Sequence, residues 1–284
     1  MSLTAPDRVA TVADQVARAN SSGRTPVVFI HGLWLLPSSW DRWAAMFEEA
    51  GFSAVKPGWP DDPQTVAEAR AYPEVFARKT VGQVADHMEA VIRQLTKKPA
   101  VVGHSFGGLL TQMVAGRGLS AASVAIDPAP FRGVLPLPFS ALKSASPVLL
   151  NPANRGRSVM LTFDQFRYGW TSNLSEREGK ELYDEFHVPG PGAPLFQAAF
   201  ANVNPGTQVK VDTMNPARGP LLIIEGDADH TVPWSIANAS YGRQKRNPGV
   251  TEIHRMPGLG HSLVIDGGWR NVAEVALAFL KRFL

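Results

Sequence analysis

The chain has 284 residues, 44% of them hydrophobic, which is enough for one large α/β domain with a buried core and room for an insertion. Its net charge is only +3 and its basic residues are scattered, which argues against a nucleic-acid-binding protein. The sequence has no cysteine, which excludes disulfides, thiolate metal sites and a cysteine nucleophile.

The beginning of the chain predicts neither a signal peptide nor a membrane anchor. No apolar run approaches the roughly 18 residues of a membrane-spanning helix, so no membrane partner is expected. Residues 1–25 carry valines at helix-like spacing, which favours a short helix or an irregular lead-in. The charged residues that interrupt any signal-peptide core are Asp7, Arg8, Asp14 and Arg18. We therefore expect a cytoplasmic location.

Short apolar runs alternate with helical patterns in the first half of the chain. Ser38 and Ser39 can cap a helix, and Thr80 with Gln83 forms a capping box in front of another. Residues 57–78 hold four prolines and are expected to form a long loop. The apolar runs predict buried parallel strands at 26–30, 52–55, 100–102 and 121–126.

The pattern changes in residues 128–218, which hold eleven of the 23 prolines and only short helical patterns. This composition predicts an inserted helical lid, with a core made of residues 1–127 and 219–284. Strand-like runs return after the insertion, and helical patterns follow them. The alternation favours a doubly wound α/β sheet. Helices are expected in the insertion at 163–170, after Ser175 and around Leu195 to Phe200, and strands after it at 220–224 and 250–254.

The segment Gly103–Gly108, with the sequence GHSFGG, lies between a predicted strand and a predicted helix. In that context G-x-S-x-G is a nucleophile elbow, in which a strained turn lifts the serine hydroxyl clear of the sheet. Gly103 and Gly107 are required because the backbone there leaves no room for side chains. A phosphate-binding loop is the alternative, but its lysine is missing. We predict that Ser105 is a nucleophile.

A serine hydroxyl needs a base to activate it, and the base needs an acid to orient it. Such groups gather at the carboxyl ends of strands in an open α/β sheet. Residues 258–262 follow a predicted strand there and contain His261, the candidate base. The candidate acids at strand ends are Asp127, Glu225, Asp227 and Asp229.

These motifs, in this order, resemble the α/β-hydrolase superfamily over nearly the whole chain. The resemblance implies a catalytic triad of Ser105, Asp229 and His261, and its spacing to Val-Pro favours Asp229 over Asp227. Members usually begin with a strand hairpin, which residues 1–25 do not show clearly. The matching pieces are His31-Gly32, Gly103–Gly107, Gly226-x-x-Asp229-x-x-Val-Pro and Gly260-His261.

The same resemblance implies an oxyanion hole formed by the backbone N–H groups of Leu33 and Phe106. The expected reaction is hydrolysis of a small-molecule carboxylic ester through an acyl-enzyme on Ser105. The alternatives are C–C bond hydrolysis, perhydrolysis or lyase chemistry at the same site, and a ligand sensor with little turnover. The sequence does not indicate an oligomeric state.

Aromatic residues near the motifs and in the predicted lid are the only clue to the substrate. Some of them could line an apolar pocket, although a small lid also needs aromatic residues for its own packing. No H-E-x-x-H or G-x-G-x-x-G pattern occurs in a suitable context, so neither a metal nor a dinucleotide cofactor is expected. The candidate substrate-binding residues are Trp34, Phe131, Phe166 and Trp170.

Overall fold

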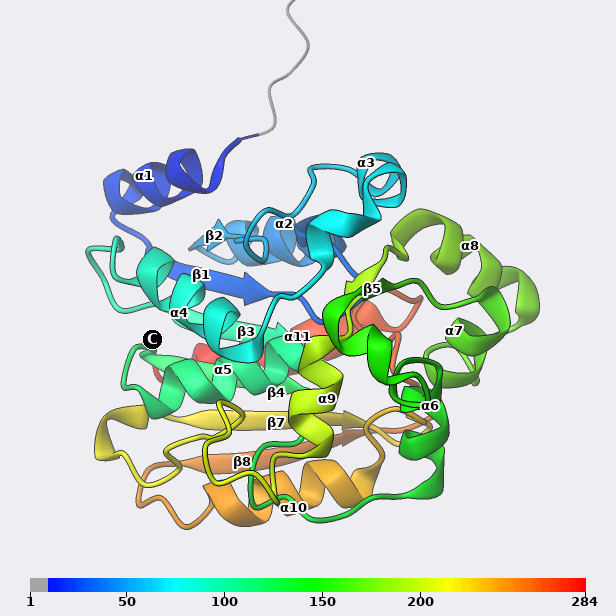
Figure 1. Ribbon diagram of the computed structural model, residues 1–284. Coiled ribbons are helices and arrows are strands. Elements are labelled where there is room, and N and C mark those ends of the chain that lie inside the picture. The colour runs from blue at the N-terminus through cyan, green and yellow to red at the C-terminus, as the bar shows by residue number, and fades with distance from the viewer. Residues whose placement is uncertain (1–9) are drawn as a thin grey trace, which may run out of the picture.

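A computed structural model describes residues 10–284, and at its centre lies a six-stranded parallel sheet with the order β2-β1-β3-β4-β7-β8 (Figure 1). The predicted α/β fold is confirmed. The inner strands are apolar and buried on both faces, as parallel strands between helical layers must be, whereas the edge strand β8 is partly exposed. The strands are β1 (Thr25–Ile30), β2 (Phe52–Val55), β3 (Ala100–His104), β4 (Ala122–Ile126), β7 (Leu221–Gly226) and β8 (Thr251–Met256).

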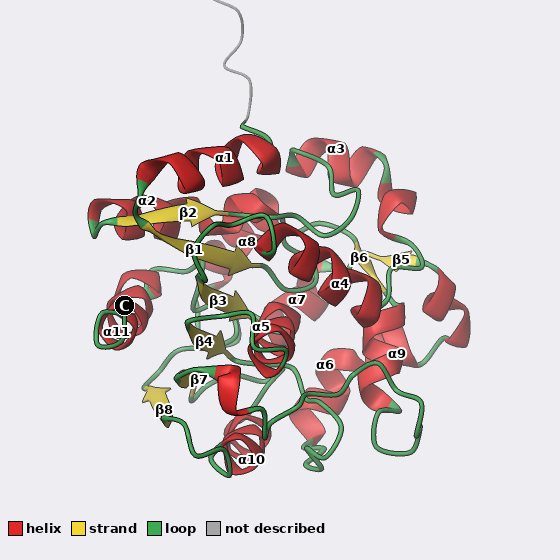
Figure 2. Cartoon of the chain, turned by 90° about the vertical axis from the view of Figure 1, so that its left-hand side faces the viewer, coloured by secondary structure: helices red, strands yellow, loops and turns green. Residues whose placement is uncertain are grey.

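Helices cover both faces of the sheet (Figure 2). Helices α4, α5 and α10 pack on one face, α2 and α11 pack on the other, and α1 lies beside β2 at the sheet edge. The predicted capping box of Thr80 and Gln83 opens α4. Among residues 10–284, no helix is both long and apolar enough to cross a membrane. The helices are α1 (Val12–Ser22), α2 (Asp41–Glu49), α4 (Val81–Ile92), α5 (Phe106–Gly116), α10 (Trp234–Gln244) and α11 (Trp269–Leu280).

The prediction of a loop over residues 57–78 is wrong, because this stretch contains helix α3 (Val66–Ala71) and the 3-10 helix η2 (Pro73–Phe76). Thr65 and Glu68 form a capping box in front of α3. The prolines lie outside α3 or at the first position of η2, where a missing N–H costs nothing. Proline density therefore marked the boundaries of these helices and not their absence.

Two further expectations concern the first elements of the chain. The helix after residue 37 begins as the 3-10 turn η1 (Pro37–Trp40), and the Ser39 hydroxyl donates to the carbonyl of Leu36 without capping α2. Residues 1–9 lie outside the described residues. From residue 10 onward the lead-in forms α1, and no strand hairpin precedes β1 in the described chain.

The stretch between β4 and β7, residues 128–218, is called the β4–β7 segment below. Figure 1 shows its helices α6, α7 and α8 beyond the carboxyl ends of the sheet strands. The helices predicted within it are found, but α6 was not predicted, because Pro138 and Pro147 suggested a loop. Its elements are α6 (Phe139–Leu149), η3 (Pro152–Gly156), β5 (Ser158–Val159), α7 (Phe163–Gly169), α8 (Glu176–Phe186), β6 (Gly190–Pro191), α9 (Ala193–Ala199) and η4 (Pro216–Arg218).

Candidate active site

The candidate site lies at the carboxyl edge of the sheet, where the strand order reverses. After β1 the chain forms β2 on one side of β1, and it then places β3 on the other side. Ile30 is opposite Gly103 in the β1–β3 pair, so the loops that follow these two strands leave the sheet side by side. Such a switch point is where ligands bind in open α/β sheets.

Ser105 sits in the turn between β3 and α5 with φ 57° and ψ −120°, in a region of backbone space that costs a non-glycine residue about 1–3 kcal/mol. A side chain at Gly103 would collide with the carbonyl of Gly107, and one at Gly107 would collide with the carbonyl of Ile30. The predicted steric requirement for both glycines is thus confirmed. The strained turn presents the Ser105 side chain to a cavity at the sheet edge.

The structure brings Ser105, His261 and Asp229 together in one buried chain of hydrogen bonds. The Nε2 atom of His261 lies 3.0 Å from the Ser105 hydroxyl, and its Nδ1 atom lies 2.6 Å from Oδ2 of Asp229. The other Asp229 oxygen accepts the backbone N–H groups of Thr231 and Val232. Since a carboxylate only accepts, Nδ1 carries the proton and Nε2 is free to accept the serine proton.

Two of the competing acids point elsewhere. Asp227 is exposed and accepts the backbone N–H of Gly258. Glu225 is buried at the end of β7, 3.3 Å from the Nε atom of Arg255, and burial raises its pKa to about 7. Asp229 is therefore the acid of this group that the fold directs at His261.

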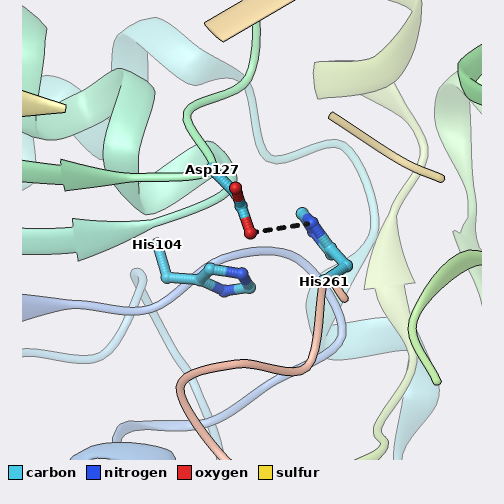
Figure 3. A group of neighbouring side chains, drawn as sticks. All are labelled: His104, Asp127 and His261. Carbon is cyan, nitrogen blue, oxygen red and sulfur yellow. Dashed lines mark ion pairs between the residues drawn. The ribbon is translucent and has the colours of Figure 1, made fainter. Parts of the chain in front are cut away.

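Asp127, the third competitor, lies close to His261 but is held differently. It ends β4 with φ 39°, and its Oδ1 atom accepts the backbone N–H of Gly226 at 2.9 Å. Its Oδ2 atom lies 4.0 Å from His261 Nδ1, too far for a hydrogen bond, and has no hydrogen-bond partner among the described residues (Figure 3). Burial, and then the charge of Asp229, raises the pKa of Asp127 well above its usual value. Burial and the neighbouring Asp229 charge therefore favour the neutral form of Asp127.

His104 completes a compact group with Asp127 and His261, drawn in Figure 3, whose possible ligand atoms all lie within 4.8 Å of one another. Burial lowers the pKa of His104 well below the usual value, so its ring is neutral. Three such residues can in principle hold a metal ion, but both His261 nitrogens already bond to Ser105 and Asp229. Sequence spacing could not reveal the group, because strand register assembles it from distant loops.

The two amides predicted for an oxyanion hole lie in backbone next to Ser105. Phe106 is the first residue of α5, so its N–H has no carbonyl one turn earlier to bond. Gly32 packs against the serine so closely that a Cβ there would lie 2.9 Å from the Ser105 Cβ. Leu33 is buried and follows Gly32 directly in the loop that packs against Ser105.

A buried polar network holds the loop after β1. The Nε2 atom of His31 lies 3.0 Å from Oδ2 of Asp62, which also accepts the backbone N–H of Trp59. Lys79 is 3.5 Å from the other Asp62 oxygen. Trp34 adopts a positive φ of 64° at the end of the loop, and its indole N–H donates to the carbonyl of Val159 in the β4–β7 segment. The loop is thus fixed from both the core and the segment.

A mainly apolar cavity of about 110 Å³ adjoins Ser105. Trp34 and Phe106 line it, as do Val232 and Ile236 from the core. Thr231 contributes as well, and the β4–β7 segment supplies the remaining wall, chiefly from α6, α9 and the stretch before α6. The segment's lining residues include Leu137, Ala141, Ala145, Leu149, Leu195 and Ala198.

Three of the four aromatic residues predicted to bind substrate do not line this cavity. Phe131, Phe166 and Trp170 are buried in the core and are not among the residues that line the cavity, whereas Trp34 is. The Trp170 ring meets the His261 ring edge-on at 4.7 Å, and Phe166 stacks behind Trp170 at 5.5 Å. Aromatic residues stand out in a sequence, whereas the small side chains that form this wall carry no signal.

Comparison with known proteins identifies the family and agrees with the fold. The model of the alpha/beta hydrolase family matches residues 27–276. A monoacylglycerol lipase from Paleococcus ferrophilus superposes with a TM-score of 0.62 and 18% identity over 91% of this chain and 95% of that one. Polyneuridine aldehyde esterase superposes with a TM-score of 0.62 and 18% identity, over 91% of this chain and 99% of that one. A pyrethroid hydrolase from Sphingobium faniae JZ-2 superposes with a TM-score of 0.61 and 17% identity, over 90% of this chain and 97% of that one. No curated protein sequence matches the chain.

Proposed function

The chain belongs to the alpha/beta hydrolase family, and from that premise we propose that it is a serine hydrolase that cleaves carboxylic esters of small to medium apolar substrates. One observation carries the proposal: the His261 ring is hydrogen-bonded at one nitrogen to the Ser105 hydroxyl and at the other to Asp229. That chain of contacts is the arrangement that activates a serine for acyl transfer.

In the proposed reaction, His261 Nε2 takes the Ser105 proton while Oγ attacks the ester carbonyl. The backbone N–H groups of Leu33 and Phe106 stabilise the tetrahedral oxyanion. His261 then gives the proton to the leaving alcohol, and the acyl group stays on Ser105. Water, activated by the same histidine, releases the acid. Asp229 keeps the ring in the required tautomer and stabilises it when it is charged.

The proposal for an apolar ester rests on the cavity and on the structural neighbours. The wall beside Ser105 is mainly aliphatic and aromatic, with few polar groups. The neighbours are named as a lipase, an esterase and a pyrethroid hydrolase. We further propose that residues 128–218 act as a lid, because helices α6 and α9 form the side of the cavity opposite the sheet edge.

The test is multiple-turnover hydrolysis of a chromogenic aryl acetate by the wild type and by Ser105→Ala. We expect the variant to lose about 10⁴-fold or more in kcat. Ser240→Ala is the matched control, since this buried serine bonds to Gln112 away from the site. Substantial hydrolysis by folded Ser105→Ala would refute the nucleophile, and product limited to one equivalent of wild-type protein would favour a sensor.

A further inference from the structure

Helix α6 and the stretch before it expose large apolar side chains to solvent. Leu135, Phe139 and Leu150 have exposed fractions of 70%, 79% and 83%. Phe139 is the first residue of α6 and Leu150 is its C-cap. The two side chains lie on the same side of the helix because they are eleven positions apart, which is close to three full turns. We call the surface formed by Leu135, Leu137, Phe139, Leu142, Lys143 and Leu150 the α6 patch.

The chain around the α6 patch is basic. Residues 128–163 contain four cationic side chains and no carboxylate. All four cations are exposed, and two of them lie in or directly after η3, which packs against α6. The first carboxylate beyond this stretch is Asp164, which borders the same surface hollow as Lys143. The four cations are Arg132, Lys143, Arg155 and Arg157.

The α6 patch also borders the cavity that contains Ser105. Leu137 and Leu142 line that cavity, yet they are 66% and 46% exposed. The same two side chains therefore belong both to the outer surface and to the cavity wall. Whatever covers the α6 patch lies beside an opening to Ser105.

We propose that the α6 patch docks on the surface of an anionic phospholipid bilayer, with its apolar side chains in the headgroup region and the nearby cations against lipid phosphates. An anionic interface attracts exposed apolar side chains that have cations beside them, here Lys143 within the patch and Arg155 and Arg157 at η3, while Asp164 contributes one carboxylate to the hollow beside Lys143. A second copy is a poorer fit, because a symmetric contact through the α6 patch would bring Lys143 and the nearby η3 cations of one copy toward those of the other. Docking needs no spanning helix, so this proposal replaces the sequence-based expectation of no membrane partner. It does not depend on the proposed ester hydrolysis.

The test is co-sedimentation of the full chain with vesicles of phosphatidylcholine alone or mixed with phosphatidylglycerol. We expect the wild type to bind the mixed vesicles more tightly, with binding that weakens as salt is raised. The triple variant Leu135→Ser, Phe139→Ser, Leu150→Ser should bind them at least about tenfold more weakly. Arg155→Ser with Arg157→Ser should lose mainly the preference for anionic lipid. Val250→Ser, which removes an exposed side chain at the amino end of β8, should bind as the wild type does.

A second measurement separates a folding defect from loss of docking. None of the three substituted residues lines the cavity, so the triple variant should keep wild-type hydrolysis of a soluble acetate ester and its melting temperature. Failure of the wild type to bind mixed vesicles would overturn the proposal. Equal binding by the triple variant would also overturn it, as would a dimer that forms through the α6 patch without vesicle binding.

Discussion

The sheet edge holds Ser105, His261 and Asp229 by hydrogen bonds and a strained turn, whereas the β4–β7 segment closes the cavity mainly with aliphatic side chains. The first region leaves its side chains little freedom, since both Asp229 oxygens and both His261 nitrogens are engaged. The second region hydrogen-bonds to the loops around the site, as Ser144 does to Thr231 at 2.7 Å and the Tyr168 carbonyl to His230 at 2.9 Å, but its side chains in the cavity wall are mainly aliphatic. The contrast suggests that chemistry is set at the sheet edge and that substrate preference is set by the segment.

The largest effect should come from Asp229→Asn. The backbone N–H groups of Thr231 and Val232 need an acceptor, so they would turn the new amide's oxygen toward themselves and its NH2 toward His261. The ring would then accept at Nδ1 and carry its proton on Nε2, where it cannot receive the serine proton. We expect kcat for an aryl acetate to fall about 10⁴-fold.

Asp227→Asn is the matched control, because Asp227 lies two positions away and accepts only the Gly258 N–H among the hydrogen bonds found. Its kcat should stay within about tenfold of the wild type, since its carboxylate does not orient the base. A ranking in which Asp227→Asn is the more damaged variant would show that the sheet edge is not organised around Asp229.

The next effect concerns the cavity wall. Ala198→Phe adds a ring to the α9 side of the cavity, about 110 Å³ in volume, without touching the hydrogen-bonded residues. We expect kcat/KM for a long-chain acyl ester to fall by about 10–200-fold, which corresponds to 1–3 kcal/mol, while the acetate ester is hydrolysed nearly as before. The measurement is kcat/KM for both esters.

Trp170→Ala is the comparison variant, because Trp170 belongs to the β4–β7 segment but packs on the His261 ring at 4.7 Å and does not line the cavity. It should reduce kcat for both esters alike and lower the melting temperature. A selective loss on the long ester in Trp170→Ala, with no selectivity change in Ala198→Phe, would reverse our assignment of the two regions.

The sheet edge could be predicted from the sequence because its requirements are local. Gly103 and Gly107 are imposed by sterics within one turn, and Asp229 stands at a recognisable distance from Val-Pro. The grouping of His104 with Asp127 and His261 could not be predicted, since it depends on which strands lie side by side.

The cavity wall was harder to predict for a different reason. The sequence does not show whether an alanine such as Ala141 or Ala198 lies in a core, on a surface or in a cavity wall. Tertiary packing decides this, and here it places both in the cavity wall. Helix α6 was hidden by Pro138 at its N-cap and Pro147 in its last turns. Phe166 and Trp170 were predicted to bind substrate because bulky aromatic residues are typical of binding surfaces, but both are buried in the core.

Acid should destabilise the β4–β7 segment through His187. This ring is buried against Tyr183, accepts the Leu161 N–H at 3.2 Å, and burial lowers its pKa to about 3. The unfolded chain takes up this proton below about 6.5, so stability present at neutral pH is lost as the pH falls toward 3. Between pH 7 and 5 the loss from this residue should be about 2 kcal/mol.

His187→Gln tests this, because glutamine can still accept the Leu161 N–H but does not titrate. The variant should show a smaller drop in melting temperature between pH 7 and 5 than the wild type. Some drop should remain, since the pKa of the buried His104 is also lowered. An unchanged pH dependence would mean that His187 is accessible to protons in the folded chain.

The smallest effect should come from Asp127→Asn, and it has the opposite pH dependence. Because the pKa of Asp127 is raised in the folded chain, the unfolded chain loses this proton first, and stability falls as the pH rises above about 4. Asparagine imitates the neutral acid: its oxygen can accept the Gly226 N–H, and its NH2 can face the Asp229 carboxylate. We expect a melting temperature about 2–4 °C higher than the wild type at pH 8, with a smaller gain at pH 5. Since a neutral side chain replaces a neutral side chain, kcat should stay within about tenfold. A loss of kcat as large as that of Asp229→Asn would instead mean that Asp127 is charged and orients His261. Asp127 and Asp229 would then contribute equally to catalysis.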